Sequence, residues 1–380
     1  MICKRGKDQN IQSRFKFFIQ CLPVLRSIVT NEIKKLGLDA YPSRNGGVIS
    51  TGGLLELYKL NLWLRTANRI LVRLLSFYTD NFNDLIDKII KYPWEIYINK
   101  TNKIIIKTDC KKSRLYHSDA VSQRVAYAIE KRIGHKIVLI KPKERDNLTQ
   151  TIFVRIFKDK CTISIDSSGA HLHERGYHVK KVKAPLRETI AAAMIYLSQW
   201  DCKEVLWDPF CGSGTILIEA ALIALNIAPG IKRNFAFMNW KNFDQKLFNS
   251  IERKKHPLNN KIKILGTDIS LEAINCSIYN AEKAGIKNMI TFSQKDFFKI
   301  KPLRTPGFII TNPPYGKRLN IYAPKFYNQI KRYLETYFPL WKISILCPQK
   351  FTKLFYPSFK YKLTINNGGI WVNLLSRNSK

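Results

Sequence analysis

Apolar residues follow different spacings in the two halves of the chain, and the change falls near residue 170. Before it, short segments alternate between the two-residue spacing of strands and the 3.6-residue spacing of helices. Residues 70–78 predict a strand, while residues 54–69 and 117–134 predict helices. Residues 151–169 alternate on both sides of Lys158–Lys160, which predicts a hairpin. This half is expected to form a small α+β assembly.

After residue 184 the pattern changes to long helices between very apolar strands. Such strands indicate a parallel sheet that helices cover on both faces. Five of them are expected, at residues 204–210, 261–270, 289–298, 307–316 and 342–347. Near the C-terminus, "YKLTI" and "IWVNLL" flank "NNGG", which predicts an antiparallel hairpin at the sheet edge. The fold class is therefore α/β, with a smaller α+β module in front.

The net charge of the chain indicates which class of molecule it binds. The 380 residues include 64 Lys and Arg against 28 Asp and Glu, a formal net charge of +36. So large an excess creates a positive field that favours polyanions, and nucleic acid suits it best. A hydrophobic content of 45% predicts a folded chain, and no apolar stretch is long enough to span a bilayer.

Location and metal content can also be predicted. The N-terminus, "MICKRGKDQN", is basic but lacks the apolar core of a signal peptide. Eight cysteines lie far apart with no C-x-x-C pair, which argues against zinc and against a disulfide framework. His171 and His173 are spaced like metal ligands, but no third ligand is nearby in the sequence. We expect a cytoplasmic protein with reduced thiols, no membrane association and no metal.

The stretch "DPFCGSGT" (208–215) is the first candidate for chemistry. It places Asp208 at the carboxyl end of a strand and Gly212 and Gly214 before a helix. Glycines at such a position let a ligand approach the backbone closely. No Lys-Ser/Thr follows them, which excludes a phosphate loop, and the dinucleotide motif G-x-G-x-x-G is incomplete. S-adenosyl-L-methionine has no phosphate and fits, since a carboxylate suits its ammonium group and the glycines make room for its methionine portion.

Two further acids follow the next two strands. Asp268 is predicted to accept hydrogen bonds from the ribose hydroxyls of the cofactor, and Asp296 from its adenine amine. Each acid could instead be a helix N-cap. Because the carboxyl ends of parallel strands meet at one edge of a sheet, all three acids are expected along a single crevice.

Asn312, Pro313, Pro314 and Tyr315 end the fourth strand and form the candidate catalytic site. An exocyclic amine on a base is a poor nucleophile because its lone pair is delocalised into the ring. The Asn312 amide oxygen and the Pro313 carbonyl can accept its two hydrogens, and two prolines hold that carbonyl rigidly. Tyr315 offers a face on which an extruded base can stack.

With these motifs the chain resembles the THUMP-domain class I RNA methyltransferases, and among them the bacterial 23S rRNA (guanine-N2)-methyltransferases. The resemblance covers nearly the whole chain through "LNLWLRTANRI", "SSGAHLHERGYHVKKVKAPLRETIAAAMI", "DPFCGSGTILIEAALIALNIAPG", "TNPPYGKRL" and "NNGGI". It implies a ferredoxin-like segment (1–60), a THUMP RNA-binding domain (61–168) and a Rossmann-like, seven-stranded methyltransferase domain (169–380). Residues 226–261, with "FAFMNW" at their centre, form a long connection that is a feature of the group.

The resemblance also implies roles for individual residues. The target base is expected at Asn312–Tyr315, and the cofactor at Asp208, Phe210, Gly212, Gly214, Thr215, Asp268, Asp296 and Asn312. The implied reaction is methyl transfer to the N2 amine of a guanine in 23S rRNA or a large-subunit precursor.

Three alternatives stay open at this point. The first is a guanine in tRNA, and the second is N6-adenine methylation of DNA, which shares the NPPY motif. The third is an RNA-binding assembly factor without turnover. The absence of an obvious helix-turn-helix argues against DNA, and the intact Asn312–Tyr315 motif argues against a factor without turnover.

Overall fold

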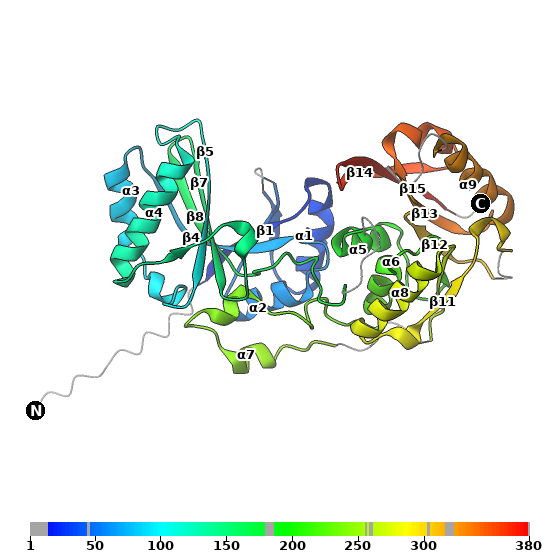
Figure 1. Cartoon of the computed structure of the whole chain (residues 1–380), viewed down its shortest axis with the longest axis horizontal. Coiled ribbons are helices and arrows are strands. Elements are labelled where there is room, and N and C mark those ends of the chain that lie inside the picture. Colours follow the sequence, from blue (N-terminus) through cyan, green and yellow to red (C-terminus); the bar gives the residue numbers. More distant parts are fainter. Residues whose placement is uncertain are drawn as a thin grey trace, which may run out of the picture.

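The computed structural model describes residues 14–43, 46–178, 186–254, 257, 261–301, 305–315 and 323–378. Figure 1 shows two lobes side by side, each built on its own β-sheet. Among the described residues, no helix is both long and apolar enough to cross a membrane.

The N-terminal lobe contains one mixed sheet of eight strands in the order β2-β3-β1-β4-β8-β7-β5-β6. The strands are β1 (Phe15–Gln20), β2 (Ala40–Pro42), β3 (Val48–Gly52), β4 (Arg69–Tyr78), β5 (Lys103–Lys111), β6 (Val138–Leu139), β7 (Thr149–Phe157) and β8 (Lys160–Asp166). The helices are α1 (Arg26–Lys35), α2 (Leu54–Trp63), α3 (Phe82–Ile90) and α4 (Ser118–Ile133). Strand β4 pairs with both β1 and β8, and so joins the ferredoxin-like strands to the remaining ones in a single sheet.

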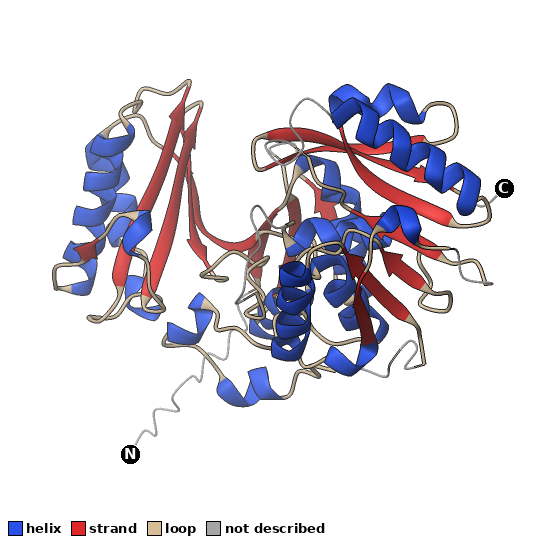
Figure 2. Ribbon diagram, turned by 45° about the vertical axis from the view of Figure 1, so that its right-hand side comes forward, coloured by secondary structure: helices blue, strands red, loops and turns tan. Residues whose placement is uncertain are grey.

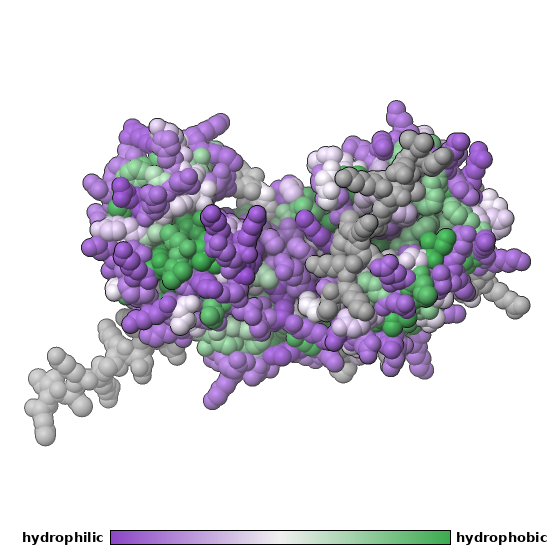
Figure 3. All heavy atoms as spheres, in the orientation of Figure 1, coloured by the Kyte–Doolittle hydropathy of each residue, from purple (hydrophilic) through white to green (hydrophobic). Residues whose placement is uncertain are grey.

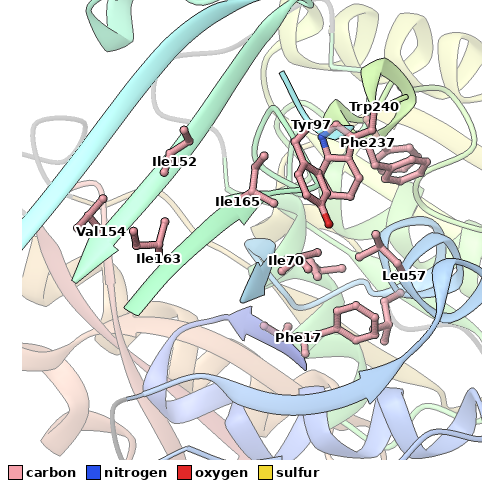
Figure 4. Close-up of a cluster of buried hydrophobic side chains, with 14 of the residues drawn as sticks. Phe17, Leu57, Ile70, Tyr97, Ile152, Val154, Ile163, Ile165, Phe237 and Trp240 are labelled. Atoms are coloured by element: carbon pink, nitrogen blue, oxygen red, sulfur yellow. The ribbon is translucent and has the colours of Figure 1, made fainter. Parts of the chain in front are cut away.

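Helices α3 and α4 cover one face of β4, β8, β7 and β5, as Figures 1 and 2 both show. Alternate residues of these strands point to that face and are fully buried, among them Ile152, Val154, Ile163 and Ile165 (Figure 4). The predicted hairpin is confirmed: β7 and β8 pair antiparallel around Lys158 and Asp159, which both have positive φ. The helix predicted at 117–134 is also confirmed and ends before Gly134, which has a φ of +73°.

The helix predicted for residues 54–69 is too long, because α2 ends at Trp63. Leu64 is extended, and the buried Glu32 carboxylate accepts the next two amides, from Arg65 at 2.8 Å and from Thr66 at 3.1 Å. Because these amides are bound by Glu32, they cannot continue the helical ladder. A residue more than thirty positions earlier therefore ends the helix.

The C-terminal lobe contains a seven-stranded sheet in the order β11-β10-β9-β12-β13-β15-β14, which confirms the predicted strand number. Its strands are β9 (Leu206–Asp208), β10 (Ile264–Asp268), β11 (Ile290–Gln294), β12 (Phe308–Thr311), β13 (Lys342–Pro348), β14 (Lys360–Asn367) and β15 (Ile370–Arg377). Its helices are α5 (Glu188–Leu197), α6 (Thr215–Ala224), α8 (Leu271–Ala284) and α9 (Ala323–Tyr337). The first five strands along the chain are parallel, and β14–β15 is the predicted antiparallel hairpin.

Apolar side chains bury both faces of this second sheet, which explains its continuous apolar strands. Ile310 packs on one face with α5, α6 and α8, while the neighbouring Ile309 packs on the other face with α9. Because both faces are covered by helices, only the ends of the strands are left for a ligand to approach.

The described part of the long connection, residues 226–254, leaves the C-terminal lobe and packs against the N-terminal one. Phe237 stacks on Tyr58 with ring centroids 4.5 Å apart, and Trp240 meets Tyr97 edge-on at 5.0 Å. Figure 4 shows Phe237 and Trp240 in the same cluster as Leu57. The connection, which contains α7 (Gln245–Asn249), therefore completes the core of the other lobe.

Buried charges also join the lobes. Arg65 donates to the carbonyls of Leu222 and Ile227 at the end of α6. Arg175 donates to the Arg65 carbonyl and lies 3.5 Å from the Glu219 carboxylate, and both side chains are almost fully buried. A buried ion pair is costly unless hydrogen bonds satisfy it, and here these bonds hold the two lobes together.

Candidate active site

The loop between β9 and α6 carries the glycines singled out from the sequence. Gly212 and Gly214 both have positive φ, +56° and +80°, a conformation that favours glycine. A Cβ on Gly214 would lie 3.2 Å from the Cβ of Ser277 on α8. The loop therefore needs glycine at 214 for two reasons, backbone conformation and close packing.

Helix α8 holds this loop in place through side chains that the sequence analysis did not single out. Ser277 Oγ donates to the Gly212 carbonyl at 2.7 Å, and Asn280 Nδ2 donates to the Ser213 carbonyl at 3.2 Å. Both side chains are fully buried. Their spacing of three residues on a helix could have suggested a shared face, but nothing in the sequence indicated its partner.

Asp208 ends β9 and is 1% exposed. Its Oδ1 accepts hydrogen bonds from Thr311 Oγ1 at 2.6 Å and from the Phe210 amide at 3.1 Å. The pKa of this carboxyl is raised to about 7, chiefly by burial and to a smaller extent by the nearby Asp268, against the lowering effect of the two hydrogen bonds. A buried carboxyl with a raised pKa is suited to bind a cationic ligand, because the positive charge would favour the ionised form of the carboxyl.

Asp268 and Asp296 lie at the carboxyl ends of the next two strands, β10 and β11, where the sequence predicted them. Each side chain is partly buried. Asp268 Oδ2 accepts from the Gly212 amide at 3.0 Å, so this acid also fixes the glycine loop. Asp296 Oδ1 accepts from the Phe298 amide at 3.1 Å and caps a short 3-10 turn. Asp208 and Asp268 end β9 and β10, and Asp296 lies two residues after β11; the three strands are adjacent and parallel. Their contacts with a cofactor stay predictions.

The corner after β12 lies next to Asp208 because Thr311 immediately precedes Asn312. Asn312 Oδ1 is buried and has no hydrogen-bond partner among the described residues. The Pro314 carbonyl accepts from Tyr327 of α9 at 3.2 Å, which fixes the corner from behind. A buried acceptor without a partner is costly, and it is explained if a ligand supplies the missing donor.

Tyr315 is held by the terminal hairpin, because β14 runs in the same direction as β12 and ends at the same edge of the sheet. Its hydroxyl interacts with the side-chain amide of Asn367, at the tip of the β14–β15 hairpin. The Asn367 turn continues into Gly368 and Gly369, both with positive φ. The terminal hairpin therefore positions the ring of Tyr315, a contact that could not be read from the sequence.

Phe210 and Thr215 flank the loop. The Phe210 ring packs against Phe297 with centroids 5.0 Å apart, so this ring belongs to the core while its backbone lies at the loop. Thr215 is the first residue of α6, and its hydroxyl lies 3.3 Å from that of Ser213.

His178 is a further residue that the sequence analysis missed. Its Nε2 lies 3.0 Å from Ser213 Oγ, and its Nδ1 lies 2.8 Å from Glu188 Oε1. The pair connects the start of α5 to the glycine loop. In the part of the chain that the structure describes, no group of three or more His, Cys, Asp or Glu could hold a metal ion.

These residues fit S-adenosyl-L-methionine. The glycine loop carries no lysine for a phosphate, a carboxyl of raised pKa lies beside it, and the acceptor on Asn312 has no partner. Carboxylates and amide oxygens accept hydrogen bonds from an ammonium, from ribose hydroxyls and from amines.

Models of three known domains match the chain. One described as the RMKL-like methyltransferase domain matches residues 175–365. The RlmL ferredoxin-like domain matches residues 16–71, and the THUMP domain matches residues 79–166. The domain limits expected at 60/61 and 168/169 stay a prediction.

Two curated relatives illustrate the similarity. The YpsC protein of Bacillus subtilis, provisionally named an RNA methyltransferase, is 36% identical over 306 residues, which are 78% of this chain and 77% of YpsC. The ribosomal RNA large subunit methyltransferase K/L of Psychromonas ingrahamii is 33% identical over 341 residues. That match covers 87% of this chain but 45% of the relative, so the chain spans about half the length of this relative.

A solved structure extends the similarity to the whole fold. The crystal structure of SMU.472, described provisionally as a methyltransferase and bound to SAH, has a TM-score of 0.83 and 28% identity. The match covers 97% of this chain and 99% of SMU.472.

Proposed function

Since the chain belongs to the RMKL-like methyltransferase family, we propose that it methylates the N2 amine of a guanine in 23S ribosomal RNA. The enzyme depends on S-adenosyl-L-methionine. The observation that carries the proposed chemistry is the buried, unpartnered Oδ1 of Asn312 at the end of β12, beside Asp208.

The acids and glycines at the strand ends would hold the cofactor. Asp208 would accept from its ammonium group, Asp268 from the ribose hydroxyls and Asp296 from the adenine amine. Gly212 and Gly214 leave room beside the backbone for the methionine portion. When bound, S-adenosyl-L-methionine supplies an electrophilic methyl group on a sulfonium.

Asn312 and Pro313 would prepare the guanine amine for reaction. The Asn312 oxygen and the Pro313 carbonyl accept its two hydrogens and turn the nitrogen lone pair out of the ring. Tyr315 would stack on the base, which must leave its helix to reach the corner. The nitrogen becomes acidic only when it gains the methyl group, so its proton can pass to water without a strong base. Most of the acceleration would come from positioning.

Ribosomal RNA is the proposed substrate for three reasons. Relatives that match over most of this chain are named ribosomal RNA large subunit methyltransferases. A THUMP domain model matches residues 79–166. The net charge of +36 suits a polyanion. Such a substrate would place the protein in the cytoplasm.

Incubation of the purified protein with methyl-tritiated cofactor and unmodified 23S rRNA, tRNA or DNA tests this proposal. We expect label in 23S rRNA alone, recovered as N2-methylguanosine after digestion to nucleosides. Label in tRNA, or N6-methyladenosine in DNA, would contradict the substrate assignment.

The catalytic assignment is tested by Asn312→Ala. Loss of one preorganised polar contact to the reacting group typically costs about 10²–10³-fold in kcat, and we expect a loss of this size. SAH affinity, measured by calorimetry, should fall much less than kcat, by about tenfold, because Asn312 is one of several residues expected at the cofactor. Asn249→Ala, at an exposed position on α7, is the control and should leave both values unchanged.

A further inference from the structure

The N-terminal sheet has one face that no helix covers among the described residues. Figures 1 and 2 show α3 and α4 on one side of β4, β8, β7 and β5, while the other side is turned toward the C-terminal lobe. Figure 3 shows this side of the molecule hollowed between the two lobes. Because side chains alternate along a strand, every second residue of these strands points to the open face.

The pairing register arranges these residues in rows across the strands. One row crosses five strands, from β5 through β7, β8 and β4 to β1: Lys107, Phe153, Ser164, Arg73 and Lys16. A second row, four residues along β7, crosses β5, β7, β8 and β4: Lys111, Phe157, Lys160 and Tyr78. Neighbouring strands are ~4.8 Å apart. At that interval the second row alternates cations and rings, while in the first row Phe153 lies between Lys107 and Ser164, and Arg73 and Lys16 follow.

Cations surround each of these rings. The Lys107 ammonium lies 5.7 Å from the centre of the Phe153 ring, and the Arg69 guanidinium lies 5.9 Å from it. Phe157 has Arg155 at 5.6 Å, and Tyr78 has Lys160 at 5.6 Å. Tyr78 is 66% exposed and Phe157 is 37% exposed. Rings and cations gathered on one face offer both stacking surfaces and positive charge to a nucleic acid.

Positive charge continues from this face toward the glycine loop. Arg69 pairs with Asp166, and Arg145 lies 3.9 Å from the same carboxylate. Beyond Arg145, a cleft of about 530 Å³ is lined by residues of both lobes, including Asn147, Arg187, Arg233 and His178. His178 contacts Ser213 of the glycine loop at 3.0 Å. Glu174 and Glu188 also line this cleft, so it offers both cations and carboxylates between the open sheet face and the candidate active site.

We propose that the open face of the N-terminal sheet binds an unpaired strand of the RNA substrate, with bases stacked on Phe153, Phe157 and Tyr78. This inference rests on the proposed function and specifies how its substrate is held. The cations of the two rows neutralise phosphates beside each stacked base. The strand then continues past Arg145 through the cleft to the glycine loop.

Unpaired RNA fits this face better than duplex RNA. A duplex hides the faces of its bases, and proteins recognise it through phosphates and 2′-hydroxyls over its grooves. Rings on a flat sheet can contact base faces only where the bases are unstacked. In the second row, the alternation of cations and rings resembles the alternation of phosphates and bases along one strand.

A triple variant, Tyr78→Leu, Phe153→Leu and Phe157→Leu, removes the stacking surfaces but keeps apolar side chains. The matched control is Tyr127→Leu on α4, on the other side of the same sheet, where the Lys131 ammonium lies 5.5 Å from an exposed ring. The probe is a fluorescein-labelled 12-mer of oligouridine, with a 12-base-pair RNA duplex as the comparison, and binding is read by fluorescence anisotropy.

Stacking contributes about 1–3 kcal/mol per base, so we expect the triple variant to bind the 12-mer at least about 100-fold more weakly. The control should match the unmodified protein, and the duplex should bind with little dependence on the three rings. On 23S rRNA, the triple variant should raise KM while kcat stays nearly constant. Calorimetry with SAH should give unchanged affinity and so confirm that the C-terminal lobe is intact.

The outcomes separate this inference from the proposed function. If 23S rRNA is methylated but the triple variant binds and reacts like the unmodified protein, the inference is wrong and the proposed function stands. If the rings matter for the 12-mer but no rRNA is methylated, the proposed function is wrong, and the open face remains a binding surface for unpaired RNA of another kind. Equal losses in the control, or equal losses on the duplex, would also overturn the inference.

Discussion

The two sheets of this protein use their surfaces in opposite ways. Helices cover both faces of the C-terminal sheet, so its candidate chemistry lies at the ends of the strands. The N-terminal sheet is covered on one face, and the other carries aromatic and cationic side chains in rows. Residues at strand ends come in short contiguous motifs, whereas residues of a row come from different strands. The first kind of site is visible in a sequence and the second kind is not.

The comparison also shows how the lobes depend on each other. Residues 226–261 interrupt the C-terminal lobe, yet Phe237 and Trp240 lie in the core of the N-terminal one. The N-terminal lobe is therefore not formed by one continuous segment of the chain, because part of its core comes from a segment inserted in the C-terminal lobe.

The largest expected effect concerns that shared core. Phe237→Ala should destabilise the N-terminal lobe by about 3–5 kcal/mol, because it removes a fully buried ring and leaves a cavity. Urea denaturation, followed by tryptophan fluorescence, measures the change. Phe157→Ala, at a ring on the open face, is the matched control and should cost less than about 1 kcal/mol. Similar losses of unfolding free energy in the two variants would mean that Phe157 is buried against other residues and that the face is not open.

Asp208 offers a second test, on the edge of the covered sheet. Its pKa is raised to about 7 in the free protein, so SAH should bind more tightly as pH rises from 6 to 8 and the carboxyl ionises. Asp208→Asn should weaken binding by about 30-fold at pH 8, since a charged hydrogen bond contributes about 2 kcal/mol, and should remove the pH dependence. Calorimetry at pH 6, 7 and 8 measures both effects.

The stability of the protein without ligand should fall as pH rises, whereas SAH affinity should increase. The raised pKa means that the folded protein holds the Asp208 proton more strongly than the unfolded chain. Stability from this group is therefore present at low pH and is lost as pH rises through about 7. At pH 8, Asp208→Asn should stabilise the protein without ligand, by up to about 4 kcal/mol. A variant that is both less stable and unaffected in cofactor affinity would contradict the assignment.

A comparison of Gly214 with Gly134 distinguishes the effect of backbone conformation from the effect of close packing in the glycine loop. Both have positive φ, +80° and +73°, but a Cβ on Gly134 would meet no atom within 4 Å, while one on Gly214 would press on Ser277. Alanine at either position should cost about 1 kcal/mol of stability. Gly214→Ala alone should also weaken SAH binding, by about tenfold. Equal SAH affinity in the two variants would show that the loop tolerates displacement.

The smallest expected effect concerns single cations on the N-terminal lobe. Lys107→Gln on the open face should lower RNA affinity a few fold and reduce the slope of log affinity against log salt by about 0.7, as for one phosphate on a single strand. Lys131→Gln on α4 should leave the slope unchanged. Anisotropy titrations between about 50 and 200 mM salt measure it. Equal slopes for both variants would show that the open face contacts no more phosphates than the helix-covered face.

Much of the architecture could be predicted from the sequence. The seven strands of the second sheet, the β7–β8 hairpin and the terminal hairpin follow from apolar spacing and from turn residues. The strand-end acids and the Asn312 corner were identified because each directly follows an apolar strand. These features depend on neighbours a few residues away, so local patterns are sufficient to recognise them.

Other features required contacts between distant residues. Helix α2 ends at Trp63 because Glu32 accepts the Arg65 and Thr66 amides. Ser277 and Asn280 hold a loop more than sixty residues earlier, and Asn367 holds Tyr315. No local pattern announces such a pair, since each partner alone resembles any polar residue on a helix or a turn.

The sequence by itself determined the two kinds of sheet, the methyltransferase motifs and the strong positive charge. The tertiary structure alone decided that β4 joins the first eight strands into one sheet and that the connection after α6 supplies Phe237 and Trp240 to the opposite core. It also decided that rings and cations share the open face. The physical reason is distance along the chain. Propensity and spacing act over a few residues, whereas register and packing are set by partners that only the folded chain brings together.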